Sequence, residues 1–136
     1  MRISRRAAAM AGLAVVALGL GAAPLLAGGE KYTDAAFEAA QKAGKPIIVD
    51  IAAAWCPVCR VQAPIVEDLA MSDRFQAFVH LEVDFDRQKD VLRRFNAQKQ
   101  STLIVFRGNK EIGRSVGDTN RASIEAMMAK ALKQPQ

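Results

Sequence analysis

The chain is 136 residues long, with 51% hydrophobic and 24% charged residues. This size and balance are those of one ordinary globular domain and leave no room for a second. The net charge of +5 does not indicate nucleic-acid binding, because three of the 19 basic residues lie in residues 1–27, where no acidic residue occurs. Without these three, 16 basic residues are balanced by 14 acidic ones, and no basic block with interleaved aromatic residues follows.

Residues 1–27 have the pattern of an export signal. A basic start, MRISRR, precedes 23 residues without a charge, and Leu25-Leu26-Ala27 is an imperfect cleavage site. We expect cleavage, since alanine and glycine make the segment only moderately apolar. The alternative is an uncleaved membrane anchor, for which 23 uncharged residues are long enough. Both alternatives predict a periplasmic protein whose folded domain comprises residues 28–136.

Helices and strands are expected to alternate along that domain. The pattern predicts helices at 33–43, from Cys56 to about Met71, at 86–95 and at 123–132, and strands at 47–51, 78–85, 102–107 and 111–116. Gly108-Asn109 is a tight turn that makes the last two strands an antiparallel hairpin. The last helix should bury Ile124, Met127, Met128 and Leu132 and begin at a cap, Thr119 or Asn120. This order predicts an α/β fold with a central mixed sheet covered by helices on both faces.

Both cysteines of the chain stand in one motif, Cys56-Pro57-Val58-Cys59, which opens the helix after the strand at 47–51. Proline is favoured in a first helical turn, where its missing N–H costs nothing. Residues three apart lie on one helix face, so the two sulfurs can close a small disulfide ring and open it again. A helix N-terminus favours the thiolate, which makes Cys56 the expected nucleophile and Cys59 the resolving thiol. The alternative of a merely structural disulfide is weak, because so short a loop removes little chain entropy.

A charged residue, Asp50, interrupts the apolar strand that leads into this motif. Carboxylates are seldom fully buried unless they are paired or functional. From the strand, Asp50 is placed to approach Cys59 from beneath and to transfer its proton. The alternative is a solvated aspartate at a strand end. Together, Cys56, Cys59 and Asp50 are the predicted catalytic residues.

These residues resemble the thioredoxin family. The likeness covers roughly residues 30–134 and includes Asp50, Trp55 directly before the cysteine pair, Arg60, Pro64, the runs LEVDFD and TLIVFRGNKEIGR, and Gly117. It is closest to thioredoxin-like thiol–disulfide oxidoreductases of the bacterial periplasm. The resemblance implies the thioredoxin-like fold, disulfide-containing protein substrates, and no cofactor beyond the redox-active disulfide of Cys56 and Cys59.

The chain departs from the family at Ser101, where thioredoxins carry a cis-proline opposite the cysteine pair. A cis peptide is costly without proline, so we expect a trans bond and a reshaped loop. The predicted substrate-binding residues are Trp55, Pro57, Val58, Gln100, Ser101 and Thr102. Trp55 is expected to form an apolar shelf for a substrate chain. The lost proline puts pairing of that loop with an extended substrate in question.

His80 is the only histidine and lies in the strand predicted at 78–85. A pairing with Asp50 could tune proton transfer. The alternative, which we favour from the sequence, is a histidine packed or hydrogen-bonded at a strand start.

The sequence therefore predicts a periplasmic thiol–disulfide oxidoreductase that acts on protein substrates. Asp50 favours a reductase, with a membrane thiol-electron transporter as electron donor and no nucleic-acid partner. The dipeptide Pro57-Val58 differs from the Gly-Pro of thioredoxins, and the direction of transfer stays open. The alternative function is a metal or iron–sulfur carrier that uses the same dithiol, left accessible by Ser101 and shared across a dimer. No metal site is predicted within one chain.

Overall fold

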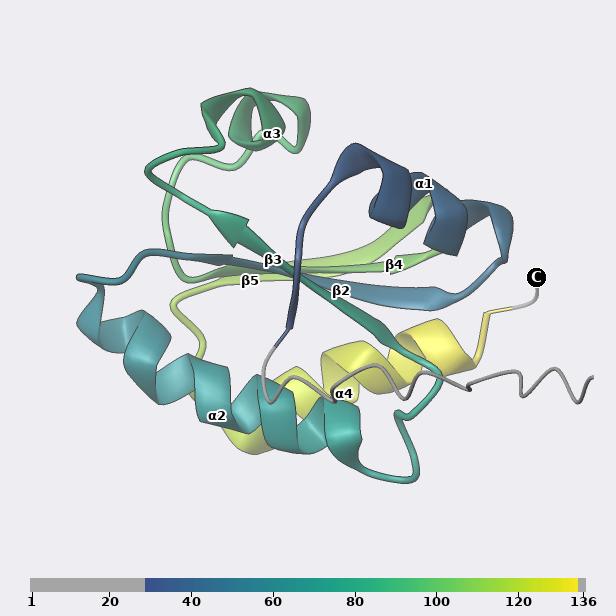
Figure 1. Ribbon diagram of the computed structural model, residues 1–136. Helices are drawn as coiled ribbons and strands as arrows, with labels where there is room; N and C mark the ends of the chain where they lie inside the picture. Colours follow the sequence, from purple (N-terminus) through teal and green to yellow (C-terminus); the bar gives the residue numbers. More distant parts are fainter. Residues whose placement is uncertain (1–28, 135–136) are drawn as a thin grey trace, which may run out of the picture.

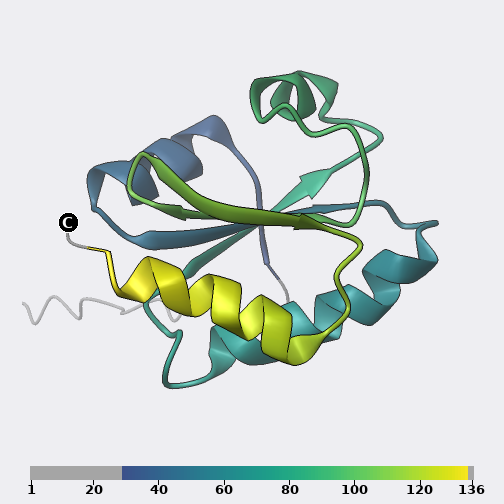
Figure 2. The same cartoon turned by 180° about the vertical axis from the view of Figure 1, so that it is seen from behind.

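The computed structural model describes residues 29–134, so the predicted export signal lies outside the described residues. Five strands form one sheet in the order β1-β3-β2-β4-β5. The strands are β1 (Glu30–Lys31), β2 (Pro46–Ala52), β3 (Val79–Asp84), β4 (Thr102–Arg107) and β5 (Lys110–Val116). The helices are α1 (Asp34–Lys42), α2 (Pro57–Met71), α3 (Lys89–Arg94) and α4 (Arg121–Leu132). Helices α1 and α3 cover one face of the sheet, and α2 and α4 cover the other (Figures 1 and 2).

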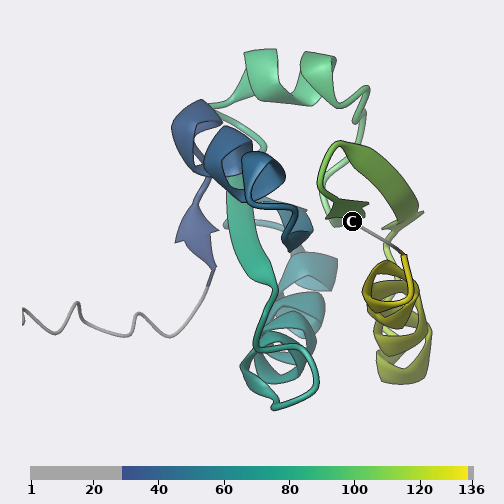
Figure 3. The same ribbon diagram turned by 90° about the vertical axis from the view of Figure 1, so that its right-hand side faces the viewer.

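The sheet is mixed, as the sequence predicted. Strands β1 and β2 both pair with β3 in parallel, whereas β2 with β4 and β4 with β5 are antiparallel. Strand β2 is therefore central and carries the chain directly into α2. In this register Asp50 lies opposite Glu82 on one side and Leu103 on the other. The edge-on view in Figure 3 shows α2 and α4 side by side beneath the sheet.

Local side-chain caps explain where the helices begin. The hydroxyl of Thr33 accepts a hydrogen bond from the backbone N–H of Ala36 at 3.1 Å and starts α1. The side chain of Asn120 accepts one from Ser123 at 3.0 Å and starts α4, which confirms the second of the two predicted caps. Helix α1 ends before Gly44, whose φ of 64° lies in the left-handed region that glycine adopts without strain.

Apart from shifts of one or two residues at other boundaries, three features differ from the sequence prediction. Helix α3 is shorter than residues 86–95, because Asp84 accepts hydrogen bonds from the backbone N–H groups of Asp86 and Arg87 and holds them in a turn. Strand β1 was not predicted, since two residues are too few to show an alternating pattern. In α4, Leu132 is 36% exposed and Ala131 is buried in its place.

Two apolar cores lie on opposite faces of the sheet. Under α1 and α3, aromatic rings gather: Tyr32, Phe37, Phe95 and Phe106. Under α2 and α4 the core is mostly aliphatic, with Ile48, Val66, Leu69, Leu103, Val105, Ile124 and Met128.

Within residues 29–134, every helix is too short or too polar to cross a membrane.

Candidate active site

The two cysteines stand at the N-terminus of α2 and form a disulfide. Their Cα atoms are 5.3 Å apart, and both residues are buried, with 1% and 5% exposed. Cys56 is the N-cap residue of the helix, and its sulfur accepts a hydrogen bond from the backbone N–H of Cys59 at 3.1 Å. The sulfur of Cys56 therefore takes the place that a serine or aspartate oxygen usually takes at a helix start.

This position has a direct chemical consequence. The first N–H groups of a helix have no partner within the helix, and they carry its positive end. A sulfur that already accepts one of these N–H groups is a better acceptor as a thiolate, because hydrogen bonds to ionised groups are stronger. The first turn of α2 holds no acidic residue that would oppose the negative charge. The geometry thus favours Cys56 as the attacking sulfur.

Asp50 is buried in β2, with 3% exposed. Side chains alternate along a strand, so Asp50 shares its face of the sheet with Ile48, which belongs to the core under α2 and α4. Asp50 Oδ1 is a buried atom without a hydrogen-bond partner. The alternative prediction, a solvated aspartate at a strand end, is therefore wrong.

His80 lies beside Asp50. Its Nε2 is 3.9 Å from Asp50 Oδ2, and this nitrogen is also buried without a hydrogen-bond partner. On the other side, His80 lines a surface hollow of about 330 Å³ together with Glu67 and Glu30. His80 thus lies between the buried carboxylate of Asp50 and the surface hollow.

A second carboxylate lies next to this pair. Glu82 is opposite Asp50 in the parallel register of β2 and β3, and such pairs point to the same face of the sheet. Partial burial, and then the charge of Asp50, raise the pKa of Glu82 above its usual value. Glu82, which is an exposed residue, therefore has the carboxylate of Asp50 as a neighbour on the same face of the sheet.

Trp55 is a half-exposed surface residue, with 54% exposed. Its indole N–H donates to Asp86 Oδ2 at 2.9 Å, and its ring meets Phe85 edge to face at 6.5 Å between centroids. Both contacts fix the ring of the residue directly before Cys56. Pro57 and Val58 are exposed next to it, so the three residues present an apolar surface around a buried sulfur.

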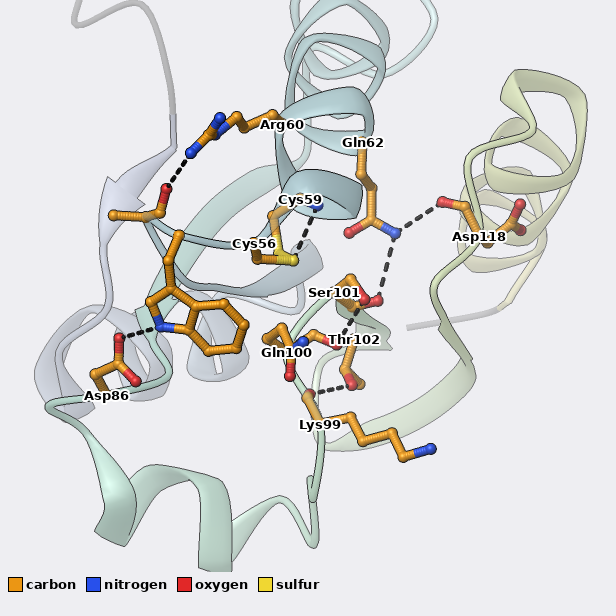
Figure 4. Close-up of a disulfide and its surroundings, with 12 residues drawn as sticks. Cys56, Cys59, Arg60, Gln62, Asp86, Lys99, Gln100, Ser101, Thr102 and Asp118 are labelled. Atoms are coloured by element: carbon orange, nitrogen blue, oxygen red, sulfur yellow. Dashed lines mark hydrogen bonds between the residues drawn. A yellow bond between two sulfur atoms is a disulfide. The ribbon is translucent and has the colours of Figure 1, made fainter.

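The loop before β4 lies opposite the disulfide, as Figure 4 shows. The peptide bond before Ser101 is trans, as expected without proline, and Ser101 has a φ of 56°. Its hydroxyl donates to the carbonyl of Gln100 at 2.6 Å, and the hydroxyl of Thr102 donates to Lys99 at 2.6 Å. Ser101 and Thr102 are buried and Gln100 is partly buried, so this loop presents mainly its backbone to the site.

Gln62 is a site residue that the sequence interpretation missed. It follows Cys59 by three positions on α2 and is fully buried. Its side-chain nitrogen donates to the carbonyl of Asp118 at 2.7 Å and to that of Ser101 at 3.4 Å. The only sequence signal was a glutamine on the helix face that carries two core residues, Val66 one turn on and Leu69 two turns on.

Residues 29–134 contain no group of three or more histidine, cysteine, aspartate or glutamate side chains placed to hold a metal ion. A metal or iron–sulfur centre on this dithiol would need further ligands from elsewhere, such as the cysteines of a second copy. The carrier hypothesis therefore depends on a dimer.

Comparison with known proteins relates the fold and site to one family. The family model described as thioredoxin matches residues 29–130. The chain is 32% identical over 101 residues to a thioredoxin of Alicyclobacillus acidocaldarius, which covers 74% of this chain and 95% of the relative. It is 34% identical over 95 residues to a bifunctional thioredoxin reductase/thioredoxin of Mycobacterium leprae, covering 69% of this chain and 20% of that protein. The crystal structure of Trxlp from Edwardsiella tarda superposes with a TM-score of 0.71 at 38% identity, covering 73% of this chain and 96% of the other.

Proposed function

The chain belongs to the thioredoxin family, and from this premise we propose that it is a periplasmic reductase of protein disulfides. Thiol–disulfide exchange with disulfide-containing proteins is the chemistry of the family, and Cys56 and Cys59 supply it here. The observation that carries the proposal is the sulfur of Cys56 at the N-cap of α2, 3.1 Å from the N–H of Cys59. The direction of transfer and the compartment are the parts that go beyond the family.

The proposed cycle begins with the reduced protein. The Cys56 thiolate attacks one sulfur of a substrate disulfide, a mixed disulfide forms, and the second substrate sulfur leaves as a thiolate that takes a proton from water. Cys59 then loses its proton and attacks the Cys56 sulfur. This step closes the disulfide between the two cysteines and releases the first substrate sulfur as a thiolate, which takes a proton from water. Two electrons have passed from the protein to the substrate.

Asp50 is the proposed proton acceptor for Cys59. Its carboxylate is buried on the face of the sheet that α2 covers, and Oδ1 lacks a hydrogen-bond partner. A buried carboxylate oxygen without a partner is free to accept a hydrogen bond from a thiol. His80, 3.9 Å away at the wall of a surface hollow, provides the route by which that proton reaches water.

The surface around Cys56 suits a protein substrate. Trp55, Pro57 and Val58 offer an apolar area with a fixed aromatic ring, and the loop of Gln100, Ser101 and Thr102 offers backbone opposite it. An extended segment that carries a disulfide would lie between them.

The proposed compartment follows from residues 1–27, whose basic and apolar pattern is that of an export signal. In the periplasm a reductase needs electrons from the cytoplasm, so we infer a membrane thiol-electron transporter as donor. The fusion named for the Mycobacterium leprae relative, a thioredoxin joined to a thioredoxin reductase, supports the reducing direction for this kind of domain.

A trapping experiment tests the function. The Cys59→Ala variant, expressed as the full chain, should accumulate mixed disulfides through Cys56 with periplasmic proteins, and the wild type should reduce insulin in the presence of dithiothreitol. Cys56→Ser is the matched control and should trap nothing. Absence of trapped partners together with absence of insulin reduction would contradict the proposal, and a coloured protein after anaerobic purification would favour the carrier function.

A further inference from the structure

Gln62 joins the redox helix to two loops of the site. Its side-chain nitrogen donates to the carbonyl of Ser101, before β4, and to that of Asp118, after β5. Because both partners are carbonyl oxygens, the amide must present its NH₂ group to them. The amide oxygen is therefore turned the other way, and Figure 4 shows it on the side that faces the two sulfurs.

This oxygen is an acceptor without a donor. Gln62 is fully buried, and Oε1 has no hydrogen-bond partner while the disulfide is closed. Buried acceptors are rarely left unpaired, because the group has lost its water. Helical side chains lean back toward the preceding turn, and the turn before Gln62 carries Cys59 on the same face. In the closed disulfide Cys59 has no proton to donate.

The loop that Gln62 holds is strained. Ser101 has a φ of 56°, a region that residues with a Cβ atom rarely adopt and that persists only where the surroundings enforce it. Its carbonyl accepts from the backbone N–H of Gly117 at 2.8 Å as well as from Gln62. Gln62 on α2 thus helps to hold the loop in place at Ser101, the position where this chain has no proline.

We propose that Gln62 links the redox state of the cysteine pair to the Ser101 loop: its nitrogen positions the loop, and its oxygen accepts a hydrogen bond from the Cys59 thiol in the reduced protein only. The inference rests on the proposed function, since it needs a pair that opens and closes. When an external dithiol reduces the pair, two electrons enter the sulfur–sulfur bond, and the donor leaves as a disulfide. Cys56 becomes a thiolate, Cys59 a thiol, and one of the donor's two protons goes to solvent.

Two consequences separate this role from simple packing. The reduced form gains a hydrogen bond that the oxidised form lacks, so Gln62 shifts the equilibrium toward the dithiol. The positioned loop favours protein substrates, which contact it, over small disulfides, which reach Cys56 without it. Gln62 is a positioning residue and touches no substrate.

The test compares Gln62→Met, which keeps the length and removes both hydrogen-bonding groups, with Gln41→Met as control. Gln41 also donates from its side chain to a backbone carbonyl, that of Gly108, but lies on α1 across the sheet. In Gln62→Met the equilibrium constant for reduction by glutathione should fall about tenfold, which is about 30 mV for a two-electron couple. The rate of insulin reduction should fall about tenfold, and the rate with a small aromatic disulfide less than twofold. Gln41→Met should match the wild type in all three.

A spectroscopic measurement covers the case in which Gln62→Met does not fold. In Cys56→Ser the only thiol is Cys59, so its S–H stretching band is resolved in the infrared. The band should lie at lower frequency than that of a thiol without an acceptor, and it should shift up in Cys56→Ser/Gln62→Met if that variant folds. The inference would be overturned by an S–H band at the frequency of a free thiol in Cys56→Ser, or by a wild-type equilibrium constant in Gln62→Met. In either case, insulin reduction by the wild type would still support the proposed function. A wild type unable to cycle would instead overturn the function.

Discussion

The two faces of the sheet differ in what they bury. Under α1 and α3 the core consists of apolar side chains and one tyrosine, with Phe37 packed edge to face against Phe95 and Phe106 at 5.3 and 5.2 Å. Under α2 and α4 the aliphatic core is interrupted toward the cysteines by polar groups, among them Asp50 and Gln62. The first face contains a single unpaired polar atom among these residues, the hydroxyl of Tyr32, whereas the second contains several polar side chains close to the strand and helix that carry the cysteines.

This difference separates folding from chemistry within a small domain. Buried polar atoms without partners destabilise a fold, and on the α2 face they include Asp50 Oδ1, His80 Nε2 and Gln62 Oε1. Asp50 lies on the strand that leads into the cysteine helix, His80 lies beside Asp50, and Gln62 lies one turn after Cys59. The aromatic face supplies the packing that makes this arrangement tolerable. Variants on the two faces should therefore fail in different ways.

The largest effect on stability is expected on the face of the sheet under α1 and α3, called here the aromatic face. Phe37→Ala removes a buried ring that contacts Tyr32, Phe95 and Phe106 and should lower the free energy of unfolding by about 3–5 kcal/mol. Urea unfolding of the full chain measures it. The rate of insulin reduction per folded molecule should stay as in the wild type. A comparable loss of rate in the folded fraction would show that the two faces are not separate.

The next largest effect, on the rate of catalysis, is expected on the face of the sheet under α2 and α4. Asp50→Asn keeps the shape and removes the proton acceptor, and it should slow the release of mixed disulfides about 100-fold, within the range of general acid–base catalysis. Stopped-flow measurement of Cys59 attack on a preformed mixed disulfide reports this step. Asp73→Asn, on the exposed segment after α2, is the control and should be neutral. A rate within twofold of the wild type would exclude Asp50 as the acceptor.

A smaller, pH-dependent effect is expected at Glu82. Its pKa is raised, first by burial and then by Asp50, so the charged form is disfavoured in the folded protein. The stability that the neutral acid provides is complete below the pKa of the unfolded chain and is lost as pH rises through the folded pKa. Glu82→Gln should therefore raise the free energy of unfolding at pH 7, by at most about 1 kcal/mol, and leave it unchanged at pH 3. An equal change at both pH values would contradict this assignment.

The smallest effect is expected in alkali, on the aromatic face. Burial raises the pKa of Tyr32 to about 12, so the folded protein keeps the proton that the unfolded chain loses near pH 10. Stability should fall as pH rises from 10 to 12, because the unfolded state is then favoured by ionisation. The free energy of unfolding of Tyr32→Phe should fall less steeply between pH 10 and 12, and it should equal that of the wild type at pH 8. Urea midpoints across this pH range provide the comparison.

Much of the fold followed from local pattern. The apolar run around Ile48 predicted the central strand, and Cys56-Pro57 predicted the start of α2. For the cap of α4 the sequence offered Thr119 or Asn120, and the structure shows Asn120. Each of these depends on neighbours a few residues away, which the sequence displays directly. The start of α3 did not follow, because the side chain of Asp84 holds the preceding residues in a turn that composition does not reveal.

The site was predicted only in part, for a related reason. Cys56, Cys59 and Asp50 follow one another along the chain, whereas Gln62 gains its role from carbonyls of Ser101 and Asp118, 39 and 56 residues away. The closeness of His80 to Asp50 depends on the register of β2 against β3, which a shift of one residue would remove. Contacts between residues so far apart in the sequence become visible only in the folded structure.

The reduction potential of the full chain tests the central claim most directly. Equilibration with reduced and oxidised glutathione, followed by quantification of the free thiols of Cys56 and Cys59, gives the value. For a reductase built on this dithiol we predict a potential near that of thioredoxin, about −270 mV. A potential near −120 mV, that of a strong oxidant, or a cysteine pair that does not exchange with glutathione at all, would contradict the account.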